Sequence, residues 1–243
     1  MRQIMDLLYG HKKQMVAAAD ALPSRDAYPF PLAREHAVLG TDLLGPDAPV
    51  DPQPWPADTQ VIVLAGGCFW GIERVAWQHP GVVSTAAGYA GGFTAHPTYD
   101  EVFSAQTGHA EAVRVVLPAG PKALDALLVQ FWEQHDPTTA NQQGNDIGTE
   151  YRSAVYWTDP AQEQVVRASA ERYQEALDAA GRGRITTELR ALADTPSGRF
   201  YLAEPEHQQY LARNPHGYCN HGFNGVACST ASDAGPVETV SAS

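Results

Sequence analysis

The chain lacks several features that mark particular classes of protein. None of its 243 residues lies in an apolar run near the ~18 residues that a membrane helix needs, and segment 1–14 has no apolar core of a secretory signal. Lysine and arginine number 16 against 28 aspartates and glutamates, a formal net charge of −12, and the basic residues form no cluster. We therefore expect a cytoplasmic protein with neither a nucleic-acid nor a membrane partner.

Cysteine is also scarce, with three residues in the chain. An odd number fits poorly with the fully paired framework of a secreted protein. A chain of this length buries roughly 70–75% of the surface that its unfolded form exposes, so it needs no disulfide or metal to fold. The three thiols are therefore available for chemistry.

Proline divides the chain into regions, because eight of the 18 prolines fall between Pro23 and Pro56. Such a stretch offers too few backbone N–H groups for a helix or sheet, which predicts an irregular extension over 1–59. Residues 60–228 read as the compact body, with two cysteines in its glycine-rich end, 214–228. Segment 229–243 is small and polar, which predicts a mobile tail.

The apolar patterns of the body predict a strand, a helix, two strands, a helix and a strand, at 61–65, 69–76, 82–89, 111–115, 122–135 and 153–157. Alternation in 111–115 indicates a half-exposed strand. A further helix begins with Asp159 as N-cap and Pro160 at its first position and runs to about 180, followed by a strand at 185–189. The order βαββαβ is the split βαβ pattern, so we expect an α+β fold: a ferredoxin-like, two-layer plait with a largely antiparallel mixed sheet.

Cys68 follows the first predicted strand and Gly66-Gly67, at the start of the next helix. The free N–H groups and dipole of a helix N-terminus favour an anion, so we expect a stabilised thiolate with a lowered pKa. A cysteine at such a junction is equally often a small buried apolar residue, and position alone does not decide between the two.

The neighbours of Cys68 allow two interpretations each. Phe69 and Trp70 have the spacing of core residues, but beside a reactive thiol they could form an apolar box for a methyl group. Glu111 in an alternating strand would ordinarily face solvent, whereas in an apolar pocket its raised pKa would make it a proton donor.

Two polar segments remain. The loop 141–152 is long enough to bind a ligand or to move, although an ordinary surface crossover explains it as well. Cys219, His221 and Cys228 lie in a flexible stretch that could carry a thiol to a distant partner. The same three side chains could instead hold zinc, but three ligands leave a structural zinc site incomplete.

Taken together, the motifs closely resemble peptide methionine sulfoxide reductase of the A class. The resemblance covers about 60–228 and rests on an ordered set of motifs: GGCFWG at 66–71, GYAGG at 88–92, PTY at 97–99, TGHAE at 107–111, HDP at 135–137, QGNDIGTEYRS at 143–153, ITTE at 185–188 and EHQQYL at 206–211. A cysteine followed by Phe-Trp would be a weak signal alone, whereas the ordered set is very specific.

The resemblance implies an oxidoreductase in which Cys68 attacks the sulfur of the S epimer of methionine sulfoxide and becomes a sulfenic acid. It implies that Phe69 and Trp70 cradle the methyl group and that Glu111 donates a proton. Tyr99 and Tyr151 would hydrogen-bond the sulfoxide oxygen, with Asp146 shaping the pocket. Because sulfoxide oxygen leaves poorly unless protonated, a neutral carboxyl beside the thiol supplies what a thiolate lacks.

The resemblance further implies that Cys219 resolves the sulfenic acid as a disulfide and that Cys228 passes this disulfide to thioredoxin, with no bound cofactor or metal. Residues 220–224 are less uniformly glycine-rich than in familiar members, which leaves the order of this relay open. The extension 1–59 is absent from the shortest members, and its simplest role is to wrap the surface.

Two rival classes remain open. One is a cysteine hydrolase that uses Cys68 with His109, His135 or His207 as base, but it leaves Cys219 and Cys228 unexplained. The other is a redox-responsive or zinc-binding module built on the tail. The preference for free or protein-bound substrate is open, and a monomer is the default expectation.

Overall fold

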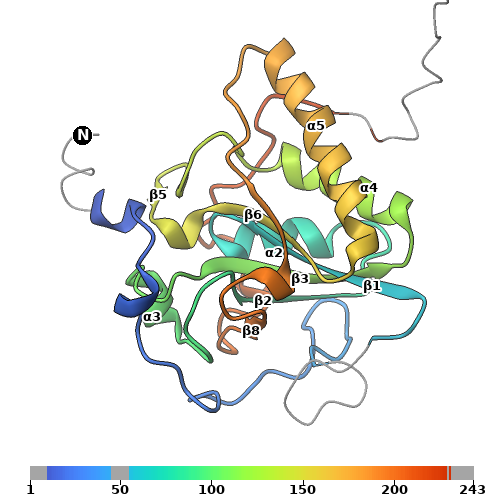
Figure 1. Cartoon of the computed structure of the whole chain (residues 1–243). Helices are drawn as coiled ribbons and strands as arrows, with labels where there is room; N and C mark the ends of the chain where they lie inside the picture. The colour runs from blue at the N-terminus through green and yellow to red at the C-terminus, as the bar shows by residue number, and fades with distance from the viewer. Residues whose placement is uncertain (1–9, 45–54, 229, 231–243) are drawn as a thin grey trace, which may run out of the picture.

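Six strands form one sheet at the centre of this computed structural model (Figure 1), which describes residues 10–44, 55–228 and 230. Its strands are β1 (Thr59–Gly66), β2 (Ser84–Ala90), β3 (Ala110–Pro118), β6 (Ser153–Trp157), β7 (Glu188–Ala191) and β8 (Phe200–Leu202). They lie in the order β7-β6-β1-β3-β2-β8, and all neighbours are antiparallel except β6 and β7. The expected α+β class with a largely antiparallel sheet is therefore confirmed.

Several boundaries differ from the sequence-based prediction. β6 has the expected bounds, whereas β2 starts at Ser84 rather than at 82 and β7 lies three residues beyond the predicted start of its strand. β8 was not predicted, because three residues carry too little periodicity. Most of the predicted tail 229–243 lies outside the described residues.

Three long helices cover one face of the sheet: α2 (Phe69–Trp77), α4 (Pro121–Glu133) and α5 (Glu163–Ala179) (Figure 1). Their apolar stripes and the facing strand residues form one buried cluster that includes Ile72, Leu128, Trp132 and Tyr173. Asp159 caps as predicted, with its carboxylate accepting from Ala161 N–H at 2.8 Å, but the turn it caps is the 3₁₀ helix η4 (Pro160–Gln162) before α5.

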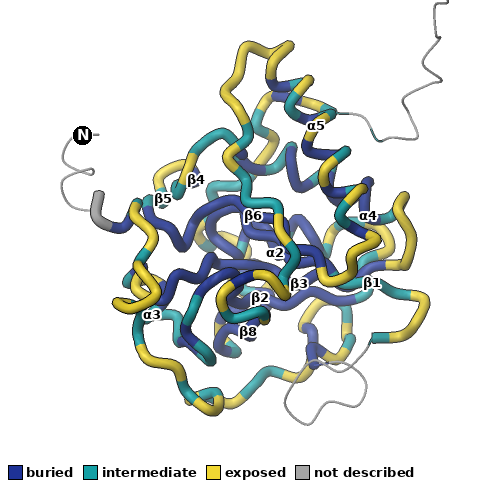
Figure 2. The backbone as a smooth tube through the Cα atoms, in the orientation of Figure 1, coloured by how far each residue is buried: buried dark blue, intermediate teal, exposed yellow. Residues whose placement is uncertain are grey.

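The amino-terminal arm packs on the opposite face of the sheet (Figure 1). That face carries small side chains, among them Ala65, Ala112 and Ala154, which let the chain approach closely, and Leu43 and Leu44 of the arm are fully or almost fully buried against them. β3 is consequently buried from 110 to 117 (Figure 2). The prediction of a half-exposed strand was wrong because both faces of β3 are covered.

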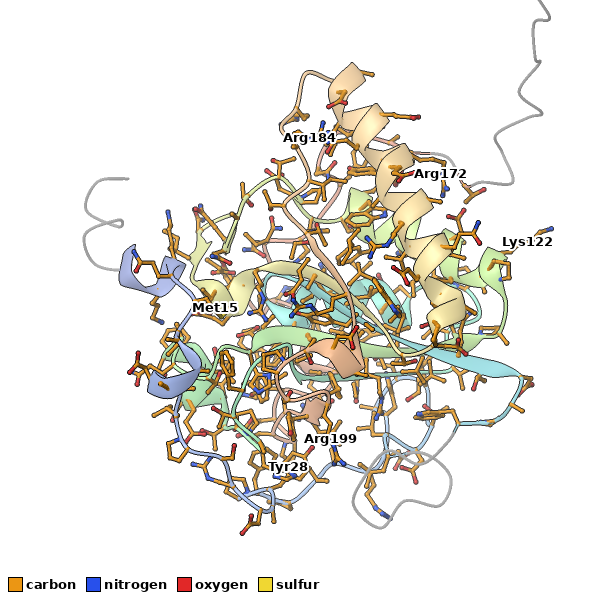
Figure 3. All side chains as sticks on the ribbon, viewed as in Figure 1. Met15, Tyr28, Lys122, Arg172, Arg184 and Arg199 are labelled. Atoms are coloured by element: carbon orange, nitrogen blue, oxygen red, sulfur yellow. The ribbon has the colours of Figure 1, made fainter. Side chains whose placement is uncertain are left out.

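Polar contacts also attach the arm to the body. Leu202 N–H donates to the Tyr28 hydroxyl at 3.1 Å, on the side of the sheet away from α4 and α5 (Figure 3), and Arg25 pairs with Glu101 at 2.6 Å. Short elements complete this region: the 3₁₀ helices η1 (Gly10–Lys13) and η2 (Ala18–Asp20) of the arm, and the helix α3 (Tyr99–Phe103). Within the described part of the chain, no helix is both long and apolar enough to cross a membrane.

We expect Leu43→Ala to lower the free energy of unfolding by about 2–4 kcal/mol, because the Leu43 side chain is fully buried between the arm and the sheet. Urea unfolding followed by circular dichroism measures the change. Val38→Ala, at an arm position that is 46% exposed, is the control and should stay within about 0.5 kcal/mol of the parent. Equal effects of the two substitutions would mean that the arm is not part of the folded unit.

Candidate active site

Cys68 occupies the junction between β1 and α2. It is the N-cap residue of α2, and its side chain is 6% exposed. Gly67 before it has a φ of +98°, and a Cβ at this position would lie 2.5 Å from the Gln143 side chain. Glycine is therefore required where the chain turns and where the loop after α4 crosses it. The junction holds the thiol in a fixed place under that loop.

Glu111 lies next to this junction and faces the helical side of the sheet. It pairs with Tyr89 across β2 and β3, it is 2% exposed, and its Oε2 accepts the Phe69 backbone N–H at 2.9 Å. The N–H is one of the free donors at the start of α2. Of the two sequence interpretations, the structure thus favours the buried carboxyl beside Cys68 over a solvent-facing one.

Burial controls the protonation of both groups. It raises the pKa of Glu111 to about 8, against the opposing effect of the Phe69 N–H, and the charges of Glu150 and Asp146 raise it further. Burial also raises the pKa of the Cys68 thiol well above its usual value, with the charge of Glu111 as the second cause. The expected lowering of the thiol pKa by the helix N-terminus is therefore wrong for the free protein. The Trp70 N–H does favour the thiolate, but desolvation outweighs it.

Aromatic rings line the approach to the thiol. Phe69 is buried in the core cluster, with its centroid 6.3 Å from that of Tyr99. Trp70 is partly buried, stacks on Tyr210 at 3.9 Å and donates its indole N–H to His207 Nδ1 at 3.2 Å. The His207 ring also lies 4.4 Å from that of Tyr99. Phe69 and Trp70 thus pack as their spacing indicates, and their contact with a methyl group stays a prediction.

The two expected phenols come from different elements. Tyr99 starts α3, where a capping box between Thr98 and Glu101 fixes the first turn and Glu204 accepts the Tyr99 N–H at 2.7 Å. Tyr151 ends the 3₁₀ helix η3 (Thr149–Tyr151) and is 8% exposed. Burial, followed by the charge of Glu111, raises the pKa of both hydroxyls, so they remain donors at neutral pH.

Asp146 contacts the carboxy-terminal segment. It belongs to the short hairpin of β4 (Gln142–Gln143) and β5 (Asp146–Ile147). Its carboxylate accepts from the Tyr218 hydroxyl at 2.9 Å and from Asn220 Nδ2 at 2.8 Å, and burial raises its pKa. The loop 141–152 is therefore more than a surface crossover, because it supplies Tyr151 and anchors the segment that carries Cys219.

Cys219 is held by the last turn of α2, the helix that begins at the Cys68 junction. Arg74 Nη2 donates to its Sγ at 3.0 Å, and the charge of Cys219 acts on Cys68. His221 Nε2 lies 2.7 Å from the carbonyl oxygen of Gly66, and a Cβ on Gly71 would lie 2.1 Å from the same imidazole. These contacts place the segment over the Cys68 junction.

Cys228 lies elsewhere. Its N–H donates to Glu133 Oε1 at 2.8 Å, at the end of α4, and its side chain packs against the main core cluster. Asn224 fixes the preceding stretch by donating to the carbonyl oxygens of Trp132 and His135. The structure thus brings Cys219 to the Cys68 site and leaves Cys228 apart, and none of the three cysteines forms a disulfide.

Each rival interpretation requires its own arrangement of side chains. Both ring nitrogens of His109 and His135 are engaged by backbone groups or by Ser153, and His207 Nδ1 accepts from Trp70, so each of the three candidate bases has another partner. In residues 10–44, 55–228 and 230, no three histidine, cysteine or acidic side chains form a group that could hold a metal ion.

Sequence reasoning missed Glu204, Arg74 and the positioning role of His207. Glu204 accepts from the Tyr89 hydroxyl at 2.8 Å as well as from Tyr99 N–H, so it supports two rings of the site. No local signal identifies it, because its partners lie 115 and 105 residues away. Arg74 belongs to α2, but its contact with Cys219 depends on where the carboxy-terminal segment folds.

We expect the Cys68 thiol to titrate above the ordinary range of about 8.5 in the free protein. The measurement follows thiolate absorbance in the far ultraviolet against pH. The variant that carries both Cys219→Ser and Cys228→Ser leaves Cys68 as the single thiol to be titrated. The triple variant that also carries Cys68→Ser gives the background. A thiolate already present below neutral pH would contradict the dominance of burial.

The comparisons with known proteins agree with this geometry. The family model described as peptide methionine sulfoxide reductase matches residues 60–233. The peptide methionine sulfoxide reductase MsrA of Salmonella schwarzengrund is 52% identical over 216 residues, which cover 88% of this chain and 95% of the relative. MsrA 1 of Caulobacter vibrioides is 50% identical over 219 residues, or 90% of this chain and 94% of the relative.

Solved structures give the same result. Methionine sulfoxide reductase A of Corynebacterium diphtheriae superimposes with a TM-score of 0.75 at 44% identity, covering 89% of this chain and 99% of that one. The reduced form of Mxr1 from Saccharomyces cerevisiae gives a TM-score of 0.61 at 33% identity and covers 70% and 95%. The chain therefore belongs to the peptide methionine sulfoxide reductase family.

Proposed function

We propose that the protein reduces the S epimer of methionine sulfoxide to methionine, as a repair enzyme for oxidised polypeptides. Family membership supports the activity. The observation that carries the mechanism is the carboxyl of Glu111, which is buried beside Cys68 and has a pKa raised to about 8 by that burial. A carboxyl that holds its proton at neutral pH can protonate the oxygen that must leave sulfur.

In the first step the sulfur of Cys68 attacks the sulfoxide sulfur while Glu111 protonates the sulfoxide oxygen. The oxygen passes to Cys68, which becomes a sulfenic acid, and methionine is released. The substrate sulfur gains two electrons and the Cys68 sulfur loses two. The proton of the Cys68 thiol returns to Glu111, so no net proton is consumed.

The hydroxyls of Tyr99 and Tyr151 donate hydrogen bonds to the sulfoxide oxygen, and their raised pKa values keep them protonated. Phe69 and Trp70 receive the methyl group. Asp146 shapes the pocket through its hold on the carboxy-terminal segment.

In the second step Cys219 attacks the sulfenic sulfur of Cys68, which forms a disulfide and releases water. The electrostatic effect of Cys219 on Cys68 supports this assignment, because it requires the two sulfur atoms to lie near each other. Arg74, in the last turn of α2, holds the Cys219 Sγ. Cys228 then attacks the Cys219 sulfur of this disulfide, which forms a Cys219–Cys228 disulfide and releases the Cys68 thiol. Thioredoxin, whose dithiol supplies two electrons, reduces the new disulfide. The exchange requires release of the hydrogen bonds of Asn224.

The remaining assignments follow from this function. We place the catalytic domain at 60–228, with 1–59 as an extension and 229–243 as a tail. We expect a monomer in the cytoplasm, where reducing conditions would keep the three cysteines as thiols. For the fold, the adjacent strands β6-β1-β3-β2 and the order β1, α2, β2, β3, α4, β6 support a ferredoxin-like split βαβ core.

A reductant-free assay on the two separated sulfoxide epimers of an acetylated methionine peptide tests the function. We expect methionine from the S epimer only, and none from either epimer with Cys68→Ser.

We expect Glu111→Gln to slow methionine formation by ~10²–10³-fold with little change in the substrate concentration for half-saturation. With the parent protein the rate should fall as pH rises through about 8, because Glu111 then loses its proton.

The control for Glu111→Gln is Glu163→Gln, which removes an exposed carboxylate that pairs with Arg167. Its rate should match the parent. If Glu111→Gln retained the parent rate, Glu111 would not be the proton donor; methionine from the R epimer alone would overturn the proposed substrate.

The relay predicts how many methionines each variant releases without reductant. The parent should release about two, since exchange of the disulfide to Cys219 and Cys228 frees Cys68 for a second turnover. Cys228→Ser should release about one and end as a Cys68–Cys219 disulfide. Cys219→Ser should also release about one but end as a sulfenic acid, which dimedone traps. Continued turnover of Cys219→Ser with thioredoxin would contradict the relay.

A further inference from the structure

The amino-terminal arm reaches the site through one side chain, that of Lys12 in η1. Lys12 is 7% exposed, and its Nζ lies 3.4 Å from Oε1 of Glu150, whose side chain is completely buried. Nζ also donates to the carbonyl oxygen of Phe103 and lies 3.7 Å from the centroid of the Phe103 ring. A lysine is rarely buried to this degree unless it is paired, so this contact needs an explanation.

Lys12 connects the two elements that carry the proposed phenols. Phe103 ends α3, which begins with Tyr99, and Glu150 immediately precedes Tyr151 in η3. The neighbouring backbone supports the same position, because Asn141 Nδ2 donates to the carbonyl oxygen of Lys13 at 2.8 Å. One ammonium group therefore lies between the segments that must present two hydroxyls to one oxygen atom.

Glu150 is an unusual buried acid. Its carboxylate lies against Gly148, where a Cβ would approach Oε2 to 2.2 Å, and within the described chain Oε2 has no hydrogen-bond partner. Burial raises the pKa of Glu150 to about 7, and the charge of Lys12 opposes that rise. Without the ammonium, the pKa of Glu150 would rise further, so the carboxyl would keep its proton to a higher pH.

The charge of Glu150 acts on Glu111, the proposed acid. Burial is the main cause of the raised pKa of Glu111, and Glu150 is the charged group that adds most to it. The titratable and charged groups that face Glu111 or Glu150 are Cys68 at the start of α2, Tyr89 on β2, Tyr99 on α3, Asp146 on β5, Tyr151 on η3, Lys12 on η1 and Arg152 after η3. Lys12 is the member of this set that the extension contributes.

We propose that Lys12 is a positioning residue for the reaction: its ammonium group joins η1 to the buried carboxylate of Glu150 and to the Phe103 carbonyl oxygen, and so fixes the Glu150 charge near the site while α3 and η3 hold their phenols together. The inference rests on the proposed function and deepens it, because it gives the extension a part in the chemistry. Lys12 itself touches neither the substrate nor the reacting atoms.

The test is the pH dependence of single-turnover methionine formation from the S epimer, without reductant, between about pH 6 and 10. Loss of the Glu150 charge lowers the pKa of Glu111, so the alkaline limb should move to lower pH by about half to one unit in Lys12→Met. Glu150→Gln should give the same shift. The double variant should shift no further than either single one, and Lys12→Arg should restore the parent profile.

The matched control is Arg25→Met, which removes another ion pair between the arm and α3, at Glu101. Its alkaline limb should coincide with that of the parent. A uniform loss of rate in Lys12→Met with an unmoved limb would reduce Lys12 to a structural contact and overturn the inference. If Lys12→Met fails to fold, an unmoved limb in Glu150→Gln overturns it equally. A parent protein that forms no methionine would instead refute the proposed function.

Discussion

Exclusion of water from the carboxyl group of Glu111 is the constraint on which the site depends. The group sits on a strand that helices cover on one side and the amino-terminal arm covers on the other. A single backbone N–H, from Phe69, stabilises the ionised form, and this is too little to offset the loss of solvent. The result is an acid that still carries its proton near neutral pH, where an exposed glutamate would have lost it.

The exclusion of water also raises the pKa of the neighbouring Cys68 thiol. Cys68 stands at a helix N-terminus, a position that favours a thiolate, yet burial and the adjacent carboxyl keep it protonated. A protonated thiol reacts slowly with adventitious oxidants. In the proposed mechanism, this pair holds two protons until a sulfoxide oxygen enters and accepts the proton of Glu111, so the reaction begins only when substrate is bound.

The carboxy-terminal segment holds Cys219 and Cys228 at two different places. Contacts from Asp146, Arg74 and the Gly66 carbonyl hold the first tail cysteine over the active junction, while the second lies beside the end of α4. The segment that makes these hydrogen bonds belongs to no helix or strand, so the bonds can break and re-form at a modest cost in free energy. In the proposed relay, such anchoring would let one thiol stay inside the site while another reaches an external reductant.

Local patterns in the sequence were enough to identify the strand and helix that flank Cys68, the bounds of β6 and the family, because periodicity and motifs act over a few residues. They could not identify β8, the complete burial of β3 or the contacts of Glu204, whose partners come from remote segments. The sequence alone determined which chemical groups are present and the order in which they occur. Only the tertiary structure decided their protonation, because a pKa depends on how much water the whole fold leaves around a group.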